Sequence, residues 1–231
     1  MTIDTAVQQL ADHPTIAVVD YGIGNLRSAQ KALQRCGANA ILTADLDAIR
    51  TASAVVLPGV GAFGACMDAL RSAGLDEPVR SAAASGRPFL GICVGMQMLF
   101  DGSDEDPNAV GLGIIPGRVR WLGTDLPRPQ MQWNQLDLVH RNDVLFAHLD
   151  RSPWMYFVHS LHGVPTDANA VIATCDYGMT VNAAFRTGNV VAAQFHPEKS
   201  STAGLTLLSN FVQVARQHCV TGDSICGQID R

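Results

Sequence analysis

Residues 88–97 read Pro88-Phe89-Leu90-Gly91-Ile92-Cys93-Val94-Gly95-Met96-Gln97, and the rest of the chain can be interpreted around them. The apolar run from Pro88 to Ile92 predicts a short buried strand, and the apolar residues from Met96 to Phe100 predict a helix after it. One cysteine, with Gly91 and Gly95 on either side, lies between the two elements. A strand, a sharp turn with a reactive atom and a helix form a nucleophile elbow, which is a feature of α/β sheets.

The neighbours of the cysteine favour a chemical role for this turn. Gly91 and Gly95 let the strand and helix backbones approach more closely than side chains would allow. The backbone N–H of Val94 can stabilise an oxyanion, which makes Cys93 a candidate nucleophile. A buried structural cysteine is the alternative, because cysteines in apolar segments commonly have that role. Residues 88–97 by themselves leave both interpretations open.

Composition argues against several classes of protein. The chain has 231 residues, of which 47% are hydrophobic and 16% are charged, and its formal net charge is −5. This length can bury the core of one large domain. The absence of a Lys/Arg run argues against a nucleic-acid groove, and the apolar runs are far shorter than the roughly 20 residues of a membrane span. The six cysteines are scattered, so we expect neither a zinc site nor a disulfide framework. We therefore expect a cytoplasmic location.

The first half of the chain predicts alternating strands and helices. The expected strands span 15–20, 40–43 and 53–57, and the expected helices span 26–36 and 76–85, with an alanine-rich helix through Met67 and Leu70 between them. The strands are apolar throughout, which is typical of a parallel sheet covered on both faces. Such sheets place their sites beyond the carboxyl ends of the strands. The loops 22–25 and 58–61 and the cysteine at 93 all fall at that edge.

The second half predicts strand-like segments joined by turns, after a polar loop over 102–108. These segments span 118–122, 135–139, 155–158, 170–174, 182–185 and 190–195. We expect them to form an antiparallel or mixed extension of the same sheet, within one domain over residues 15–218. An amphipathic helix over 200–218, capped by Ser200 or Ser201, ends the domain. Residues 1–14 are predicted to be an N-terminal extension and 219–231 a C-terminal tail.

A cysteine nucleophile needs a base, and the seven histidines provide the candidates. Four of them lie near the chain ends or among polar residues, which leaves His159, His162 and His196. His196 follows an apolar strand and is therefore expected at the same sheet edge as Cys93. Glu198 lies two residues further on and can hold one imidazole nitrogen, which is the orienting role in a catalytic triad. A histidine that merely ends a strand is the alternative, and the nearby carboxylate favours the catalytic interpretation.

Two motifs together resemble the class I (triad) glutamine amidotransferases: Gly91-Ile92-Cys93-Val94-Gly95-Met96-Gln97 and Phe195-His196-Pro197-Glu198. Within that family, four stretches are similar to the glutaminase subunits of imidazole glycerol phosphate synthase, namely 19–26, 57–63, 155–160 and 195–200. The resemblance runs from about residue 15 to about residue 216. It implies a central, mostly parallel sheet flanked by helices, with an antiparallel or mixed extension and a nucleophile elbow.

The resemblance also implies a reaction, the hydrolysis of glutamine to glutamate and ammonia. Cys93 would attack the side-chain amide, His196 would carry a proton to the leaving ammonia, and Glu198 would orient His196. The N–H of Val94 would hold the oxyanion together with a second N–H from the loop 58–61.

That loop and two polar residues complete the implied substrate site. In the loop, Gly59 and Gly61 flank Val60 and allow a peptide plane to rotate, so the second oxyanion donor can depend on a partner. Gln97 and Ser160 would contact glutamine. A solvated helix residue is the alternative for Gln97, and a turn residue is the alternative for Ser160.

The implied partner is a cyclase, a (β/α)8 barrel that forms a heterodimer with the glutaminase. It would use the ammonia to make imidazole glycerol phosphate and AICAR in histidine biosynthesis. The expected partner contacts are Asn25, Met131, Trp133 and Lys199, with core packing as the alternative for Trp133. The resemblance implies no cofactor and no metal, and neither a nucleic acid nor a membrane as partner. In agreement, the Gly22-x-Gly24 loop lacks the third glycine and the following acid of a dinucleotide fingerprint.

One segment departs from the family pattern, which has His-Met-Gly-Trp-Asn where this chain has Gln130-Met131-Gln132-Trp133-Asn134. The segment is expected to face the cyclase, so the departure bears on the interface and on coupling rather than on the triad. It leaves open an amidotransferase that supplies ammonia to a different synthase. A cysteine hydrolase of related fold and a non-catalytic binding module are the more distant alternatives.

Overall fold

The structure is a computed structural model, described here over residues 13–226, so residues 1–12 of the predicted extension and 227–231 of the predicted tail lie outside the described residues. Within this range, an eight-stranded sheet has the order β2-β1-β3-β4-β13-β12-β11-β8. Its first five strands are parallel to one another. They are β1 (Thr15–Val19), β2 (Asn39–Thr43), β3 (Ala54–Gly59), β4 (Phe89–Cys93) and β13 (Val190–Ala193).

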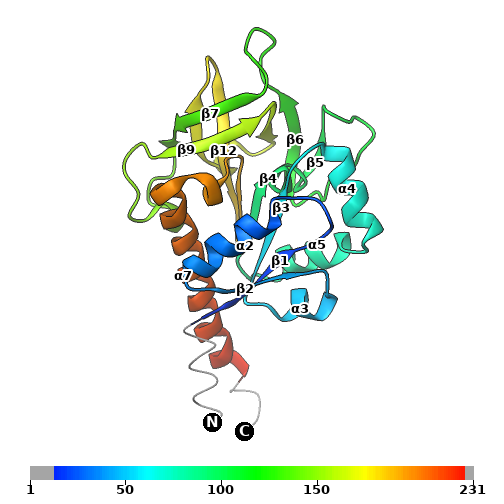
Figure 1. The fold of residues 1–231 in the computed structure, drawn as a ribbon, viewed down its shortest axis with the longest axis vertical. Helices are drawn as coiled ribbons and strands as arrows, with labels where there is room; N and C mark the ends of the chain where they lie inside the picture. Colours follow the sequence, from blue (N-terminus) through cyan, green and yellow to red (C-terminus); the bar gives the residue numbers. More distant parts are fainter. Residues whose placement is uncertain (1–12, 227–231) are drawn as a thin grey trace.

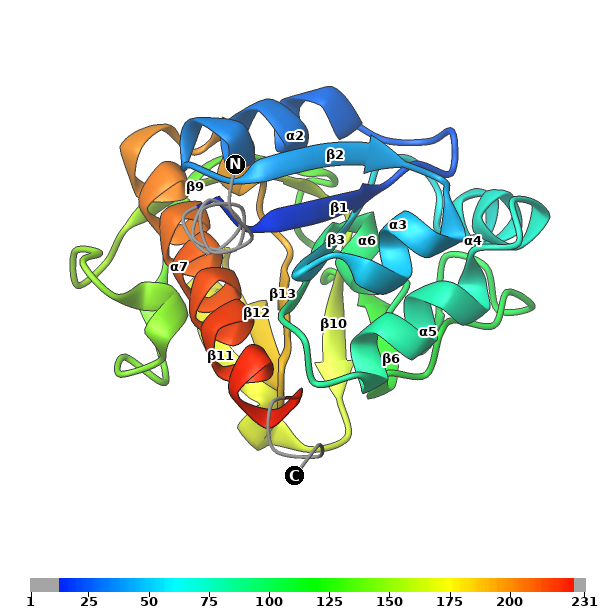
Figure 2. The ribbon, with the colours of Figure 1, turned by 90° about the horizontal axis from the view of Figure 1, so that it is seen from below.

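Helices cover both faces of this parallel half, which explains why its strands are apolar throughout. One face carries α2 (Leu26–Arg35) and α7 (Ser201–Cys226), and the other carries α3 (Leu46–Thr51) and α5 (Asp76–Ala84), as Figure 2 shows. A further helix, α4 (Phe63–Ser72), follows β3. The predicted parallel sheet with two helical layers is confirmed. The short α3 was not predicted, because its single buried side chain, Ile49, gives no helical periodicity.

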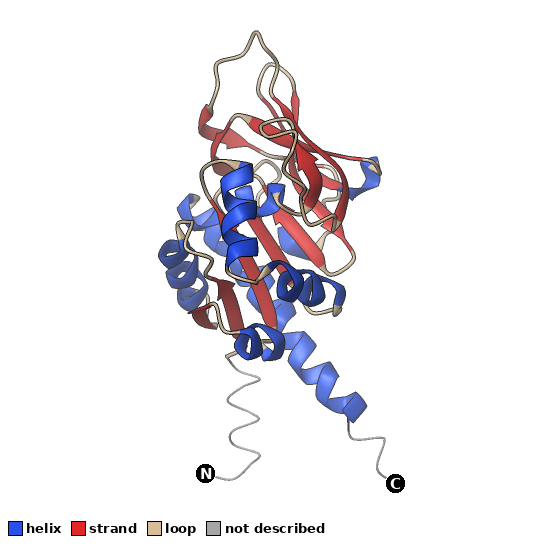
Figure 3. Ribbon diagram, turned by 90° about the vertical axis from the view of Figure 1, so that its right-hand side faces the viewer, coloured by secondary structure: helices blue, strands red, loops and turns tan. Residues whose placement is uncertain are grey.

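Antiparallel strands extend the sheet, and further strands build two smaller sheets, in one of which β5 and β6 pair in parallel. The extension consists of β12 (Thr180–Thr187), β11 (Val171–Asp176) and β8 (Asp137–Leu138). The smaller sheets are β10-β6-β5 (Leu161–Pro165, Ile115–Trp121, Phe100–Ser103) and the pair β7-β9 (Gln130–Gln135, Trp154–His159). In Figures 1 and 3 these strands gather at one end of the molecule, above the helical layers. The predicted mixed extension is therefore confirmed, although β7 and β10 were not predicted.

The segment after the elbow differs from its prediction. The helix α6 spans only Val94–Gln97, and Phe100 begins β5 instead of ending a helix. The cause is tertiary, since the C=O groups of Met98, Leu99 and Phe100 accept hydrogen bonds from N–H groups of residues 112–115. The predicted polar loop likewise begins later, because Gly102 and Ser103 belong to β5.

The last helix also differs from its prediction, at both ends. It continues to Cys226, so the predicted tail is helical up to that residue. Ser200 does not cap the helix with its side chain. Its hydroxyl donates to the C=O of His196 (2.6 Å) and accepts from the N–H of Tyr156 (2.9 Å). Ser200 thus ties the backbone of His196 to β9.

One continuous set of buried side chains joins the parallel half to the strand-rich end. Phe100 meets Phe185 edge to face at 5.3 Å between ring centroids, and Phe157 meets Phe195 at 5.7 Å. These aromatic pairs fix the small sheets on the large one. Among residues 13–226, we find no helix with the length and apolarity needed to cross a membrane.

Candidate active site

The nucleophile elbow has the strained backbone that its sequence predicts. Cys93 has φ 55° and ψ −117°, a conformation that non-glycine residues rarely adopt and that clusters at functional sites. A Cβ on Gly95 would lie 1.9 Å from the carbonyl oxygen of Leu57, and a Cβ on Gly91 would lie 2.9 Å from the Cα of Met96. Both glycines are therefore required by the close approach of β3, β4 and α6. The turn presents Cys93 at the carboxyl edge of the sheet.

The sheet brings a histidine and a glutamate to the same edge. β13 pairs with β4 in parallel, with Ala193 opposite Ile92, so the chain after β13 emerges beside Cys93. The Nδ1 atom of His196 lies 2.8 Å from Oε1 of Glu198, and both side chains are almost completely buried. The His196 ring also hydrogen-bonds to Cys93. The structure thus places the three residues of the predicted triad together.

The charge of His196 follows from these contacts. Burial alone would lower the pKa of His196, but the hydrogen bonds to Cys93 and Glu198 outweigh burial and raise it to about 9. The imidazole therefore carries a proton at neutral pH. A protonated imidazole beside the sulfur stabilises a thiolate and can donate that proton to a leaving group.

The raised pKa of His196 predicts that the folded protein loses stability as the pH increases. The folded state binds this proton more tightly than the unfolded chain, whose histidine pKa is about 6.5. The resulting stabilisation is complete below pH 6.5 and is lost as the pH rises through about 9. We expect the free energy of unfolding, measured with urea, to fall over this window, and His196→Gln to remove most of the slope. An equal slope in the variant would assign the titration to other groups.

A cavity of about 260 Å³ opens beside Cys93, between the sheet edge and the strands β9 and β10. Its lining includes seven of the predicted site residues: Val60, Gly61, Cys93, Val94, Gln97, Ser160 and His196. Gly59 lies just behind the lining, where it pairs with Cys93 in the register of β3 and β4. The cavity can therefore bring a small amide into contact with the sulfur.

Gln97 is buried, so the alternative of a solvated helix residue is wrong. Its Nε2 donates to Oε1 of Gln194 (3.1 Å), and Nε2 of Gln194 in turn lies 3.9 Å from the sulfur of Cys93. This chain of amides directs N–H groups toward the nucleophile. Gln194 was not predicted as a site residue, because it lies in an otherwise apolar run, although it precedes His196 by only two residues.

The cavity also contains a carboxylate that was not predicted. Glu105 lines it, and Oε2 of Glu105 accepts a hydrogen bond from the N–H of Phe63 at 2.7 Å. A carboxylate held in this way can bind the ammonium group of an amino acid. In the sequence, Glu105 lies between Asp104 and Asp106, and nothing distinguishes it from these neighbouring acids.

The other two candidate histidines, His159 and His162, form hydrogen bonds with backbone groups. His159 donates from Nδ1 to the C=O of Leu161 at 2.7 Å, and burial lowers its pKa to about 4. His162 accepts from the N–H of Asn182 at 3.2 Å, and burial lowers its pKa as well. His159 lines the cavity as a neutral ring. Within residues 13–226, no group of three or more His, Cys, Asp or Glu side chains could hold a metal ion.

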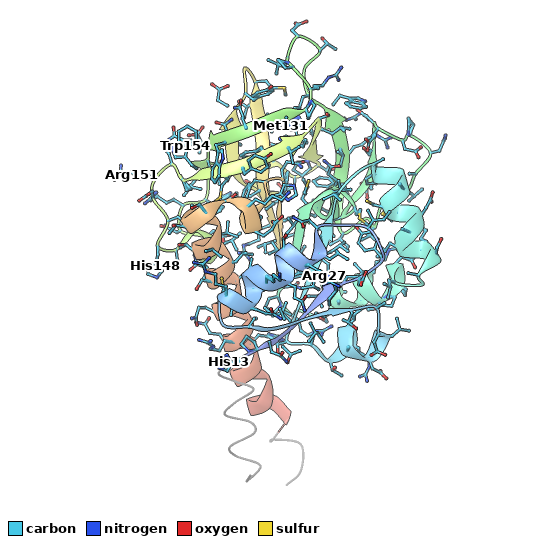
Figure 4. The ribbon with its side chains drawn as sticks, viewed as in Figure 1. His13, Arg27, Met131, His148, Arg151 and Trp154 are labelled. Carbon is cyan, nitrogen blue, oxygen red and sulfur yellow. The ribbon has the colours of Figure 1, made fainter. Side chains whose placement is uncertain are left out.

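The candidate partner contacts are largely exposed. Met131 is 65% exposed and Trp133 44% exposed, and the ring of Trp133 meets Tyr156 edge to face at 6.0 Å. Figure 4 shows Met131 on the β7-β9 pair, with Trp154 on the same pair of strands. Trp133 is therefore not an ordinary core residue. Lys199 is exposed directly after Glu198.

Two other residues of the predicted interface have internal contacts. Asn25 is half-buried and accepts a hydrogen bond from the hydroxyl of Ser28 at the start of α2. Gln130 is completely buried, and its Nε2 lies 3.9 Å from the sulfur of Cys175. The expectation that residues 130–134 face outward is therefore wrong for Gln130, while Gln132 is exposed. Of the two positions that differ from the family pattern, Gln130 thus lies in the interior of the protein and Gln132 on its surface.

Comparison with known proteins gives a family match over most of the chain. The model of the family "Glutamine amidotransferase class-I" matches residues 17–215. The imidazole glycerol phosphate synthase subunit HisH of Synechococcus elongatus is 51% identical over 210 residues, which cover 89% of this chain and 96% of that protein. The protein of the same name from Nostoc punctiforme is 48% identical over 207 residues, covering 88% of this chain and 98% of the relative.

Solved structures agree on the fold. A putative GMP synthase protein from Thermoplasma acidophilum superposes with a TM-score of 0.68 at 18% identity, covering 94% of this chain and 98% of the other. The PurLQS structure from Thermotoga maritima superposes with a TM-score of 0.66 at 22% identity, covering 88% and 97%. At these identities the likeness concerns the fold alone.

Proposed function

The chain belongs to the class I glutamine amidotransferase family, and from this membership we propose that it is the glutaminase subunit of imidazole glycerol phosphate synthase. Relatives with that name are about half identical to it over nearly their whole length. The observation that supports the chemistry most directly is the buried contact of Cys93 with His196, which Glu198 holds from the other side. We assign these three residues as the catalytic triad.

The first half of the proposed reaction releases ammonia. The Cys93 thiolate attacks the side-chain amide carbon of glutamine, and the amide oxygen becomes an oxyanion. The N–H of Val94 and an N–H of the loop 59–61 hold this oxyanion. His196 donates its proton to the nitrogen, the C–N bond breaks, and ammonia leaves a glutamyl thioester on Cys93.

The second half regenerates the enzyme. A water molecule attacks the thioester carbon and gives a proton to the neutral His196, which Glu198 keeps oriented throughout. The C–S bond then breaks, glutamate leaves, and the thiolate and imidazolium are restored. The product leaves as the γ-carboxylic acid and loses its remaining proton to water, so glutamine and water have become glutamate, ammonia and one proton.

The remaining polar groups of the cavity fit the amino-acid end of glutamine. We assign Glu105 to the α-ammonium group, because it is a carboxylate lining the cavity. Ser160 is assigned as a second polar contact, and Gln97 supports the nucleophile through Gln194 as well as lining the cavity.

The proposed partner is a cyclase with a (β/α)8-barrel fold, which uses the ammonia to form imidazole glycerol phosphate and AICAR. Met131, Trp133 and Lys199 offer exposed apolar and charged surface for it, and Asn25 contributes from the loop after β1. Trp154, 52% exposed on β9, extends this apolar surface beyond the residues expected from the sequence. Gln132 is the exposed residue through which the departure from the family pattern would alter the interface.

The test of this proposal is glutaminase activity with and without the cyclase and its nucleotide substrate. We expect glutamate release to increase about 5- to 150-fold when both are present, as a coupling of about 1–3 kcal/mol between sites would give. A full rate in the isolated chain would contradict the dependence on a partner. Activation by another synthase, but not by the cyclase, would reassign the acceptor. Ammonium salts, supplied to the cyclase without this chain, serve as the control.

A further inference from the structure

The end of β3 and the loop after it, residues 58–61, accept hydrogen bonds from two side chains that take no part in the proposed reaction. The hydroxyl of Tyr21 donates to the C=O of Pro58 at 2.8 Å, and the thiol of Cys66 donates to the C=O of Val60 at 3.2 Å. These two carbonyls lie on either side of the peptide that joins Gly59 to Val60. The N–H of that central peptide belongs to Val60, which lines the cavity.

The two donors come from different parts of the chain and contact the same loop. Tyr21 follows β1, Cys66 lies in α4, and both are buried. Their side chains also interact with each other. Burial raises the pKa of the Tyr21 hydroxyl and that of the Cys66 thiol, so both groups keep their protons at neutral pH. Both therefore remain hydrogen-bond donors while the enzyme works.

Packing leaves the loop little room to move as a whole. A Cβ on Gly59 would lie 2.8 Å from the Tyr21 hydroxyl and 2.6 Å from the backbone nitrogen of Gly95. The loop is thus enclosed between Tyr21 on one side and the elbow on the other. Gly61, which follows the second of these carbonyls, has φ 91°, a left-handed conformation that glycine adopts without strain.

We propose that Tyr21 and Cys66 are positioning residues that fix the two carbonyls flanking the Gly59–Val60 peptide, so that the N–H of Val60 can point at the oxyanion formed on Cys93. This inference rests on the proposed glutaminase function. The two side chains touch the loop and not the substrate. Their effect should therefore fall on the chemical step, since an oxyanion donor acts mainly in the transition state.

The experiment removes each donor singly and uses matched controls from the same chain. Tyr21→Phe deletes one hydroxyl, and Tyr177→Phe is its control, because the hydroxyl of Tyr177 donates to the C=O of Pro127 at 3.0 Å away from the cavity. Cys66→Ala deletes the thiol, and Cys36→Ala is its control, because the thiol of Cys36 lies 3.4 Å from the C=O of Leu205. Cys66→Ser keeps a donor and should restore the rate.

Two measurements separate positioning from folding. We expect Tyr21→Phe and Cys66→Ala to lower kcat for glutamine about tenfold, less than the 10²–10³-fold loss of a whole oxyanion donor, with KM unchanged. The rate at which iodoacetamide alkylates Cys93, followed by peptide mass, should not change, because alkylation forms no oxyanion. The control variants should retain wild-type kcat in the complex with the cyclase.

The outcomes distinguish this inference from the proposed function. A wild-type complex without glutaminase activity would overturn the proposed function and this inference with it. An active wild type with unchanged kcat in both donor variants would overturn the positioning role alone. An equal loss of kcat and of the rate of Cys93 alkylation would also overturn the positioning role, because it would show that the substitution had disturbed the elbow. If Tyr21→Phe or Cys66→Ala does not fold, Cys66→Ser is compared with a folded Cys66→Val variant. Activity in Cys66→Ser that is no higher than in Cys66→Val would contradict the positioning role.

Discussion

Replacing Cys93 with alanine is expected to abolish glutamate release while the protein keeps its fold. The sulfur is the only heavy atom removed, and it is the atom assigned to attack the amide, so no thioester can form. Losses after removal of a nucleophile are on the order of 10⁴-fold or more in kcat. The assay is glutamate release from glutamine by the complex with the cyclase. Synthesis supported by ammonium salts should be retained, because it bypasses this chain.

The matched control for this substitution is Cys175→Ala. Cys175 is also a buried cysteine, and burial raises the pKa of its thiol to about 11, but it lies outside the cavity lining. Its replacement should leave glutamate release near the wild-type rate. A Cys93→Ala protein that kept more than a few per cent of the activity would point to another nucleophile, and Cys93 would return to the role of a buried structural cysteine.

Gly95→Ala is expected to destabilise the protein and to inactivate it together. The added Cβ would lie 1.9 Å from the carbonyl oxygen of Leu57 and 2.9 Å from the carbonyl carbon of Pro58. Both contacts are with backbone atoms, which cannot rotate away as a flexible side chain can. Either the elbow or the loop after β3 must shift, so the cost should be at or above the upper end of the about 1–3 kcal/mol typical of overpacked cores. Thermal unfolding and glutaminase activity are the measurements.

Gly123→Ala provides the comparison for the loss of a glycine. A Cβ there would meet its nearest atoms at 3.7 Å, which is ordinary van der Waals contact, and the backbone is not left-handed. This variant should unfold at the wild-type midpoint and keep its activity. A Gly95→Ala protein with the same midpoint as Gly123→Ala would show that β3 and α6 are less tightly apposed than described.

Local sequence pattern sufficed for the elbow and for the position of His196. The elbow is a contiguous motif, and the apolar strand before His196 placed that histidine at the correct sheet edge. The structure adds residues whose position depends on tertiary contacts. Gln194 meets the sulfur only because β13 lies beside β4, and Glu105 reaches the cavity from a loop of similar acids.

Predictions from local sequence pattern were wrong where groups from other parts of the chain compete for the same hydrogen bonds. Met98 to Phe100 are apolar and helix-compatible, yet their carbonyls pair with residues 112–115, so the helix ends and β5 begins. Ser200 has the residue type of a helix cap, but its hydroxyl bonds to His196 and Tyr156 instead. In both cases the deciding partner is far away in the sequence or belongs to the site.

The position of β13 in the sheet has a consequence for the synthesis of the protein. β13 pairs with β4 on one side and β12 on the other, and it is the last strand of that sheet to leave the ribosome. A nascent chain that ends before residue 190 thus carries the cysteine without its histidine and glutamate. The proposed triad is complete only after residue 198 has been synthesised, so a nascent chain that ends before residue 196 lacks both the proposed base and the carboxylate that orients it.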